Sequence, residues 1–170
     1  MIKSAVVIAV AALMSTAALS AAVKVELKDA KGQPVGTAKI SDAKKGGVII
    51  ELAVKGLPVG EHAAHIHSVA KCEGPAFTSA GGHFNPDMKH HGLDSAEGPH
   101  AGDMENFKIT KTKGTTHATL VNQRVNLNND SHSLFANGGT ALVIHAKADD
   151  MKTDPAGNAG DRIACGIITK

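Results

Sequence analysis

Tryptophan and tyrosine are absent from this chain of 170 residues, and its only aromatic residues are four phenylalanines. A core without large rings must be built mainly from Val, Ile, Leu and Ala. Aromatic side chains also form the platforms on which single-stranded nucleic acids stack, and clustered Lys and Arg hold their phosphates. Here the 18 basic and 16 acidic side chains are spread along the chain. We therefore expect no nucleic-acid partner.

The chain also lacks an apolar run long enough to be an ordinary membrane span. The run from Ala5 to Leu13 falls short of the roughly 20 apolar residues that cross a bilayer as a helix. It follows Lys3 and precedes small residues around Ser20 and Ala22, an order that is typical of a secretory signal peptide. We predict a signal peptide over residues 1–22, cleaved after Ser20 or Ala22. A retained membrane anchor is the competing interpretation.

Cysteine is scarce, with Cys72 and Cys165 as the only two. No cysteine lies near the predicted cleavage site, which argues against attachment of a lipid. In an oxidising compartment an isolated pair can form a disulfide, and we expect these two to be bonded. Two free buried thiols are the alternative. Residues 23–170 are then predicted to form one exported domain, periplasmic or secreted, without stable membrane association.

A sustained helical period is missing as well. Val23, Val25 and Leu27 alternate with charged residues, a period of two that indicates a half-buried strand. Similar short runs follow, separated by glycines, and together they predict an all-β fold, an eight-stranded β-sandwich or flattened barrel. The expected strands are 23–29, 35–41, 47–55, 61–67, 105–111, 115–124, 140–146 and 162–169.

Residues 68–104 and 147–161 show no strand pattern and are rich in Gly, Pro, Asp and His. Connections of this length are usually functional or disordered. Metal coordination and a disulfide can order such a segment, because they replace core contacts that it does not make. We therefore expect these two long segments to form a functional site.

His65 and His67 flank Ile66, so strand alternation places both imidazoles on one face, about 6 to 7 Å apart. Taken alone, this pattern could equally be two stacked surface histidines. His145 ends another apolar run, and His83 follows two glycines that allow close approach of the backbone. Together these four histidines could surround Cu(II), which favours nitrogen ligands in a tetragonal arrangement.

His91, His100 and Asp103 lie further along the first long segment. With His83 they could form a closed tetrahedral site suited to Zn(II). His90 could replace His91 if the loop register shifted, but the spacing from His83 favours His91. The sequence thus predicts two adjacent metal sites that share one imidazole.

Several ordered motifs contain or flank these residues: 60–67, 82–86, 91–92, 98–103, 142–150 and 157–166. Together with the connecting strands they resemble the copper,zinc superoxide dismutases, and the resemblance covers nearly all of the mature chain. The short stretch after Cys165 is similar to the bacterial exported, periplasmic type of this family.

This resemblance implies a Greek-key β-sandwich, a bond between Cys72 and Cys165, and one copper and one zinc ion per subunit. It implies dismutation of superoxide to dioxygen and hydrogen peroxide, with His83 as an imidazolate that couples copper redox to proton supply. The implied copper ligands are His65, His67, His83 and His145, and the implied zinc ligands are His83, His91, His100 and Asp103.

The family pattern also implies roles for charged residues around the metals. Asp149 would link His65 to His91 and fix their tautomers. Arg162 matches the active-site arginine and, with His83, is the predicted catalytic residue, its cation holding the anionic substrate. Lys147 and Lys152 could add to the attracting field, although solvated lysines without such a role are as good an interpretation.

A different class of function uses the same ligands: an exported copper- or zinc-binding protein that buffers metal without catalysis. A complete copper set, a shared imidazole and Arg162 favour catalysis, because a buffer needs neither an imidazolate nor a guide for anions. The sequence is compatible with a monomer and with a homodimer.

Overall fold

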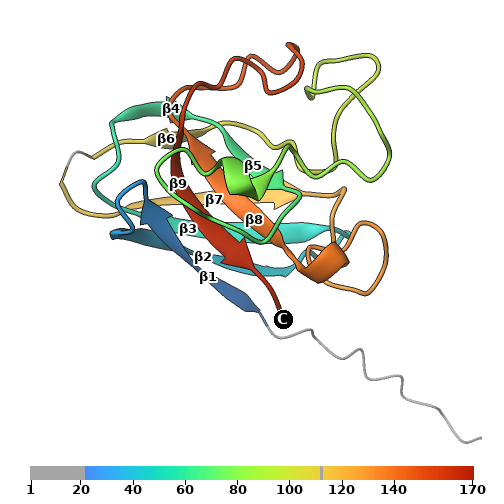
Figure 1. Cartoon of the computed structure of the whole chain (residues 1–170), viewed down its shortest axis with the longest axis horizontal. Coiled ribbons are helices and arrows are strands. Elements are labelled where there is room, and N and C mark those ends of the chain that lie inside the picture. Colours follow the sequence, from blue (N-terminus) through green and yellow to red (C-terminus); the bar gives the residue numbers. More distant parts are fainter. Residues whose placement is uncertain (1–21, 112) are drawn as a thin grey trace, which may run out of the picture.

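The computed structural model describes residues 22–111 and 113–170, and within them the chain is almost entirely antiparallel β-structure (Figure 1). The predicted signal peptide falls almost wholly on residues 1–21, outside the described residues. The strands are β1 (Val23–Asp29), β2 (Pro34–Asp42), β3 (Val48–Val54), β4 (Gly60–His62), β5 (Ala64–His67), β6 (Phe107–Ile109), β7 (Thr116–Asn122), β8 (Thr140–His145) and β9 (Arg162–Ile168). Two short 3₁₀ turns, η1 (Thr78–Ala80) and η2 (Ala136–Gly138), are the helical elements of the described part.

Seven strands form one curled sheet in the order β5-β8-β9-β1-β2-β3-β7, and β4 and β6 form a second, two-stranded sheet. Neighbours such as β9 and β1, or β3 and β7, are distant in sequence, so long connections cross from one edge to the other, as in a Greek key. The predicted all-β sandwich class is confirmed. In the described residues no helix is both long and apolar enough to span a membrane.

Alternation in the first three strands builds the core. Leu52 on β3 lies opposite Ala38 on β2, which in turn lies opposite Val25 on β1, and all three are buried. The intervening side chains, among them Lys39 and Glu51, face solvent and form an ion pair of 3.0 Å. Burial of aliphatic side chains therefore gives these strands their register, because a shift by one residue would expose the apolar face.

The predicted strand 61–67 is two strands, which raises the count from eight to nine. The chain changes partners at Ala63: β4 pairs with β6, whereas β5 pairs with β8. The backbone of Ala63 bonds instead to Lys147 and His145, with N–H···O distances of 2.8 and 2.9 Å. The sequence pattern did not predict this break, because alternation continues unchanged across a switch between two sheets.

Strand β8 is buried on both faces, whereas β1 and β2 each have one exposed face. Its inward residues Leu142 and Ile144 join the main core, whereas Ala141 and Val143 face outward beneath the first long segment. There they pack with Phe77 against the disulfide between Cys72 and Cys165, whose Cα atoms are 5.7 Å apart. The predicted disulfide is confirmed, and it attaches the first long segment to β9.

The two long segments meet at one end of the sandwich (Figure 1). Asp94 N donates to Met151 O at 3.0 Å, and His91 N donates to the Asp154 carboxylate at 2.7 Å. The segments are therefore packed against each other as well as against the sheet, and the space beneath them contains the predicted ligands.

Candidate metal centre

Strands β5 and β8 position three of the predicted copper ligands. His65 lies opposite Val143 and His67 lies opposite Ala141, while Ile66 between them enters the core. His145 is the last residue of β8, where the pairing with β9 becomes irregular. Both strands are held by ladder hydrogen bonds, so the three imidazoles are presented by rigid backbone on the face covered by the long segments.

His83 reaches the same place because the first long segment folds back along β5. His67 and His83 form an isolated antiparallel bridge, with Ser68 N donating to Gly82 O at 2.9 Å and Phe84 N to Ile66 O at 2.8 Å. Phe84 itself is buried in the main core and anchors this stretch. One ring of the long segment is thereby brought beside the ligands of the sheet.

The remaining predicted zinc ligands surround the carboxylate of Asp103. Its Oδ2 accepts hydrogen bonds from Gly92 N and His100 N, both at 2.9 Å. Its Oδ1 lies 2.8 Å from His83 Nδ1 and 3.2 Å from the Nδ1 atoms of His91 and His100. The backbone bonds hold the carboxylate in place, and the other oxygen faces three imidazoles.

The buried donors fall into two groups of four, and within each group the donor atoms lie within 4.8 Å of one another. His83 belongs to both groups. The first group is His65, His67, His83 and His145, and the second is His83, His91, His100 and Asp103. The structure therefore brings together every residue of the two predicted ligand sets.

Three buried ring nitrogens in these groups have no hydrogen-bond partner: His65 Nδ1, His83 Nε2 and His91 Nδ1. An unpaired polar atom is costly in a protein interior, so such atoms call for a partner. The Nδ1 atoms of His83 and His100 are 3.4 Å apart, as are the Nε2 atoms of His67 and His145. Nitrogens bound to one tetrahedral zinc ion are about 3.3 Å from each other. The donor sets thus fit the metals proposed for them.

Asp149 connects the two groups through hydrogen bonds to one histidine of each group. Its carboxylate accepts from His65 Nε2 at 2.7 Å and from His91 Nε2 at 3.0 Å, which leaves the Nδ1 atom of each ring facing the ligand group. Burial tends to raise the pKa of Asp149, but the hydrogen bonds from His65 and His91 outweigh it and hold the pKa well below its usual range. An ionised Asp149 therefore orients one ring of each group.

The ligands differ in how their surroundings affect protonation. Burial lowers the pKa of His67 to about 2, and it lowers the pKa of His83 and of His145 to about 4. Burial acts in the same direction on His91, yet the neighbouring carboxylates of Asp103 and Asp149 raise its pKa to about 9. Near neutral pH the His67, His83 and His145 rings are therefore neutral, the form in which histidine binds metals.

Arg162 begins β9 beside the first group. Its Nη1 donates to Phe77 O at 2.7 Å and its Nη2 to Gly81 O at 2.8 Å, and the Gly81 carbonyl also accepts from His67 Nδ1 at 2.9 Å. One carbonyl oxygen thus joins the guanidinium to a predicted copper ligand. The Arg162 cation is held in a defined position near the group.

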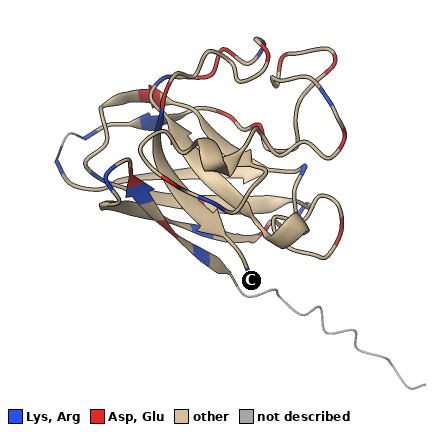
Figure 2. Ribbon diagram, in the orientation of Figure 1, with Lys and Arg blue, Asp and Glu red and all other residues tan. Residues whose placement is uncertain are grey.

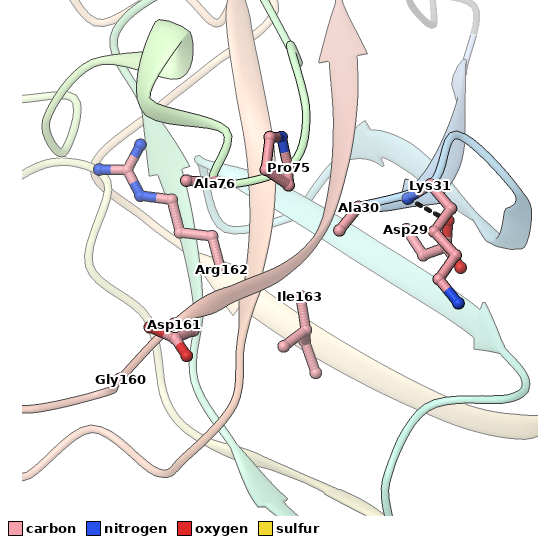
Figure 3. A pocket seen from close by; sticks show the side chains of 9 residues that line it. All are labelled: Asp29, Ala30, Lys31, Pro75, Ala76, Gly160, Asp161, Arg162 and Ile163. Atoms are coloured by element: carbon pink, nitrogen blue, oxygen red, sulfur yellow. Dashed lines mark hydrogen bonds between the residues drawn. The ribbon is translucent and has the colours of Figure 1, made fainter.

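A cavity of about 590 Å³ lies at the start of β9, lined by Arg162, Ile163, Pro75, Ala76 and residues of the β1–β2 turn (Figure 3). The Arg162 side chain points away from Ile163 and from Lys31. The cavity contains Arg162 but none of the predicted metal ligands of the described chain in its lining. It is separate from the two ligand groups.

Lys147 and Lys152, the predicted steering lysines, are exposed on the second long segment. Acidic residues outnumber lysines on both long segments (Figure 2). Asp150, Asp154 and Asp161 are exposed close to these lysines in sequence. A positive field for an anion at this site therefore has to come from nearby cations such as Arg162 rather than from the net charge of the loops.

Two histidines outside the predicted sets, His90 and His62, have other partners. His90 is exposed, and its ring lies 2.5 Å from Asp154 and 3.2 Å from Glu97, so it belongs to neither ligand group. Buried His62 lies with its ring nitrogens 2.8 and 2.9 Å from the carbonyl oxygens of His145 and Pro58. These contacts agree with the expectation that His91 rather than His90 faces the ligands, and they give His62 a structural role.

Three polar residues near the site were not identified from the sequence: Asn106, Asn122 and Arg124. Asn106 exchanges two hydrogen bonds with the backbone of Asp149, of 2.8 and 2.9 Å. Asn122 and Arg124 donate to backbone carbonyls of the turn that contains His100 and Asp103. Their partners are backbone atoms far away in sequence, and no local pattern signals such contacts.

Together, an antiparallel β-sandwich and two buried donor groups that share one histidine define a class of protein with a two-metal centre on a β-scaffold. The family model for copper/zinc superoxide dismutase (SODC) matches residues 35–168, so this chain belongs to that family.

Individual relatives agree with this assignment. The chain is 51% identical over 145 residues to superoxide dismutase [Cu-Zn] 2 of Aquifex aeolicus, covering 84% of each protein. It is 34% identical over 145 residues to the extracellular superoxide dismutase [Cu-Zn] of Haemonchus contortus, covering 81% of this chain and 76% of that protein. The crystal structure of a SOD-like protein from Bacillus subtilis superimposes with a TM-score of 0.81 at 33% identity, covering 86% and 99% of the two chains.

Proposed function

We propose that this protein is an oxidoreductase that catalyses the dismutation of superoxide. Two superoxide anions and two protons give one dioxygen and one hydrogen peroxide. His65, His67, His83 and His145 would hold copper, and His83, His91, His100 and Asp103 would hold zinc. When bound, copper supplies one-electron redox chemistry, accepting an electron from one superoxide and returning it to the next.

The observation that carries the proposal is the position of His83 in both groups. Its Nδ1 faces the Asp103 carboxylate at 2.8 Å, whereas its Nε2 is buried without a partner on the side of the first group. Nε2 is therefore the atom of His83 that can take up a proton and release it toward substrate.

Arg162 would bind the substrate anion. Its guanidinium is fixed by the carbonyls of Phe77 and Gly81, and it stays charged at any physiological pH. Superoxide offers little surface for recognition, so a positioned cation near the first group is the simplest means of holding it. Steering of anions to superoxide dismutase is itself a known example of electrostatic focusing.

The test is decay of superoxide with purified protein loaded with copper and zinc. We expect His83→Ala to slow decay by about 10² to 10⁴, the usual contribution of a positioned acid or base. His117→Ala, an exposed histidine on β7, is the matched control and should leave the rate unchanged. A wild-type rate no faster than buffer would refute the proposed activity, and the protein would then be better described as a metal buffer.

Export is a further part of the proposal, with residues 1–22 as a cleaved signal peptide and 23–170 as the mature domain. The disulfide between Cys72 and Cys165 supports an oxidising compartment, such as the periplasm or the outside of the cell. The name of the Haemonchus contortus relative describes an extracellular enzyme. Sequencing the N-terminus of protein from the exported fraction should give residue 21 or 23 first, and an intact N-terminus there would contradict cleavage.

A further inference from the structure

The turn from His100 to Asp103 presents two of the four proposed zinc ligands, and it lies against the end of β7. Neither ligand belongs to a strand. The turn is closed by Asp103 N donating to His100 O at 3.3 Å, a long and weak bond. Gly102 ties the turn to the sheet, because its N–H donates to Phe84 O at 2.8 Å and its carbonyl accepts from Ile66 N at 2.9 Å. The Asp103 carboxylate accepts from His100 N at 2.9 Å. The carbonyls of His100, Ala101 and Asp103 are left for other donors.

Two side chains at the end of β7 contact the carbonyl oxygens of this turn. Asn122, which is fully buried, donates from Nδ2 to Ala101 O at 2.8 Å and to Asp103 O at 3.4 Å. Arg124 donates from Nε to His100 O at 3.2 Å and from Nη2 to Asp103 O. Three of the four carbonyls of the turn thus bond to side chains of a different element.

The two side chains are themselves fixed to each other. Arg124 N donates to Asn122 Oδ1 at 2.8 Å, which orients the amide so that its NH₂ faces the turn. Gln123, between them in sequence, is exposed and has no contact of this kind among the described residues. The pair therefore forms a rigid donor array, which we name the β7 clamp.

We infer that Asn122 and Arg124 are positioning residues for zinc, and that the β7 clamp arranges the His100–Asp103 turn before the ion binds. This inference rests on the proposed zinc site. Without the clamp, part of the ordering of the turn would have to be driven by zinc binding, and the affinity for zinc would be lower by the free energy of that ordering. Hydrogen-bonded groups behind metal ligands commonly contribute about tenfold to hundredfold in affinity.

The clamp acts through geometry rather than charge. A guanidinium is planar and can donate to two carbonyls at once, whereas an ammonium is a compact point charge on a flexible chain. Arg124→Lys keeps the positive charge near Asp103 but cannot reproduce two directed bonds from Nε and Nη2. Asn122→Asp keeps the shape and the acceptor for Arg124 N but removes the donor to Ala101 O and Asp103 O.

The experiment measures zinc affinity of the full protein by competition with a chromophoric chelator, for wild type, Arg124→Ala, Arg124→Lys and Asn122→Asp. We expect each variant to bind zinc about tenfold to hundredfold more weakly. Gln123→Ala is the matched control and should bind as the wild type does. Cobalt(II) placed in the zinc site provides a second measurement, and its visible spectrum should change in the clamp variants because the ligands are less well oriented.

The outcomes separate the clamp from the proposed function. If wild-type protein binds no zinc at His83, His91, His100 and Asp103, the proposed site itself is wrong. If wild type binds zinc and Arg124→Ala binds it equally well with an unchanged cobalt spectrum, only the clamp is overturned. Full recovery of affinity in Arg124→Lys would likewise overturn it, because charge alone would then be sufficient. A lower melting temperature of the metal-free variant with unchanged zinc affinity would reduce the pair to a purely structural role.

Discussion

The two ligand groups are built on different kinds of backbone. In the first group, His65, His67 and His145 belong to β5 and β8, two paired strands at one edge of the main sheet. In the second, His91, His100 and Asp103 belong to a segment without strands and depend on side-chain hydrogen bonds for their positions. His83 connects the two. One group is positioned by the fold, whereas the other is positioned by contacts that the long segments make with each other and with the sheet.

This difference has a physical consequence. Ladder hydrogen bonds and core packing hold a strand whether or not a metal is present. A loop without such bonds loses conformational entropy when it becomes ordered. Part of the free energy of metal binding at a loop site therefore offsets that loss. Changes to loop contacts should therefore weaken zinc binding, whereas changes near the strands should alter rate or acid stability.

Removal of the disulfide should have the largest effect on the free energy of unfolding. The local loss of order should be greater in the long segments than in the sheet. The bond closes a loop with a sequence separation of 93, and the chain-entropy model gives about 4 to 5 kcal/mol for a loop of this size. Replacing both Cys72 and Cys165 with Ser should lower the free energy of unfolding by roughly that amount. Urea unfolding measures it, and hydrogen exchange should show more loss of protection in residues 68–104 than in β1–β3. Equal loss in both regions would contradict the comparison.

Asp149→Asn should weaken zinc binding by about tenfold to hundredfold, because the amide cannot accept from His65 and His91 with the strength of a carboxylate. Chelator competition measures the change. Asp161→Asn, an exposed acid on the same segment, is the matched control. We expect the unfolding free energy of the metal-free variant to change less than the zinc-binding free energy, and the reverse order would argue that Asp149 serves folding instead.

Arg162→Ala should slow superoxide decay by about tenfold and flatten its dependence on ionic strength, because a cation that attracts an anion is screened by salt. Zinc affinity should stay within twofold of wild type, roughly the error of such a comparison, since Arg162 contacts Phe77 and Gly81 rather than the second group. Stopped-flow kinetics at several salt concentrations measures both the rate and its slope. An unchanged rate and slope would remove Arg162 from the mechanism.

Acid should destabilise the metal-free protein through the strand-borne histidines. Burial lowers the pKa of His145 to about 4, below the value of 6.5 expected when unfolded. The unfolded state therefore binds more protons below pH 6.5, and stability falls as the pH drops from 6.5 toward 4. His91 has the opposite effect on stability, because its pKa in the folded protein is raised to about 9. Its stabilising contribution is fully present below pH 6.5 and is lost as the pH rises through 9.

His145→Gln removes one of the groups that titrate in this range. The plot of unfolding free energy against pH should become shallower between pH 6.5 and 4, by up to about 1.4 kcal/mol per pH unit. His117→Gln, on the exposed face of β7, should keep the wild-type slope. Urea titrations of metal-free protein at a series of pH values measure this, and identical slopes for His145→Gln and wild type would contradict the assignment.

Much of the scaffold could be predicted from local pattern. Alternation of Val25 and Leu27 with charged neighbours predicts the position of β1, and similar runs predict other strands that have one exposed face. The change of sheet at Ala63 could not be predicted, because it depends on hydrogen bonds to residues more than 80 positions away. Continuous burial of β8 is another consequence of tertiary structure, since the first long segment covers a face that would otherwise be exposed.

The candidate site divides in the same way. The ligand residues were predicted by their motifs, and the spacing of His65 and His67 alone placed them on one face of a strand. Nothing local identifies Asn122, Arg124 or Asn106, whose contacts are with backbone atoms of other segments. A side chain that bonds to distant backbone has no partner of recognisable type in the sequence.

The order of residues accounts for the alternation that makes strands, for the histidine and aspartate donors, and for the two cysteines. The packing of distant segments accounts for which ring nitrogen faces which neighbour, for the position of His83 between the groups, and for the contact of Asp149 with both His65 and His91. The reason is physical: alternation is a property of adjacent residues, whereas convergence of donors depends on how segments far apart in the chain pack and bond to one another.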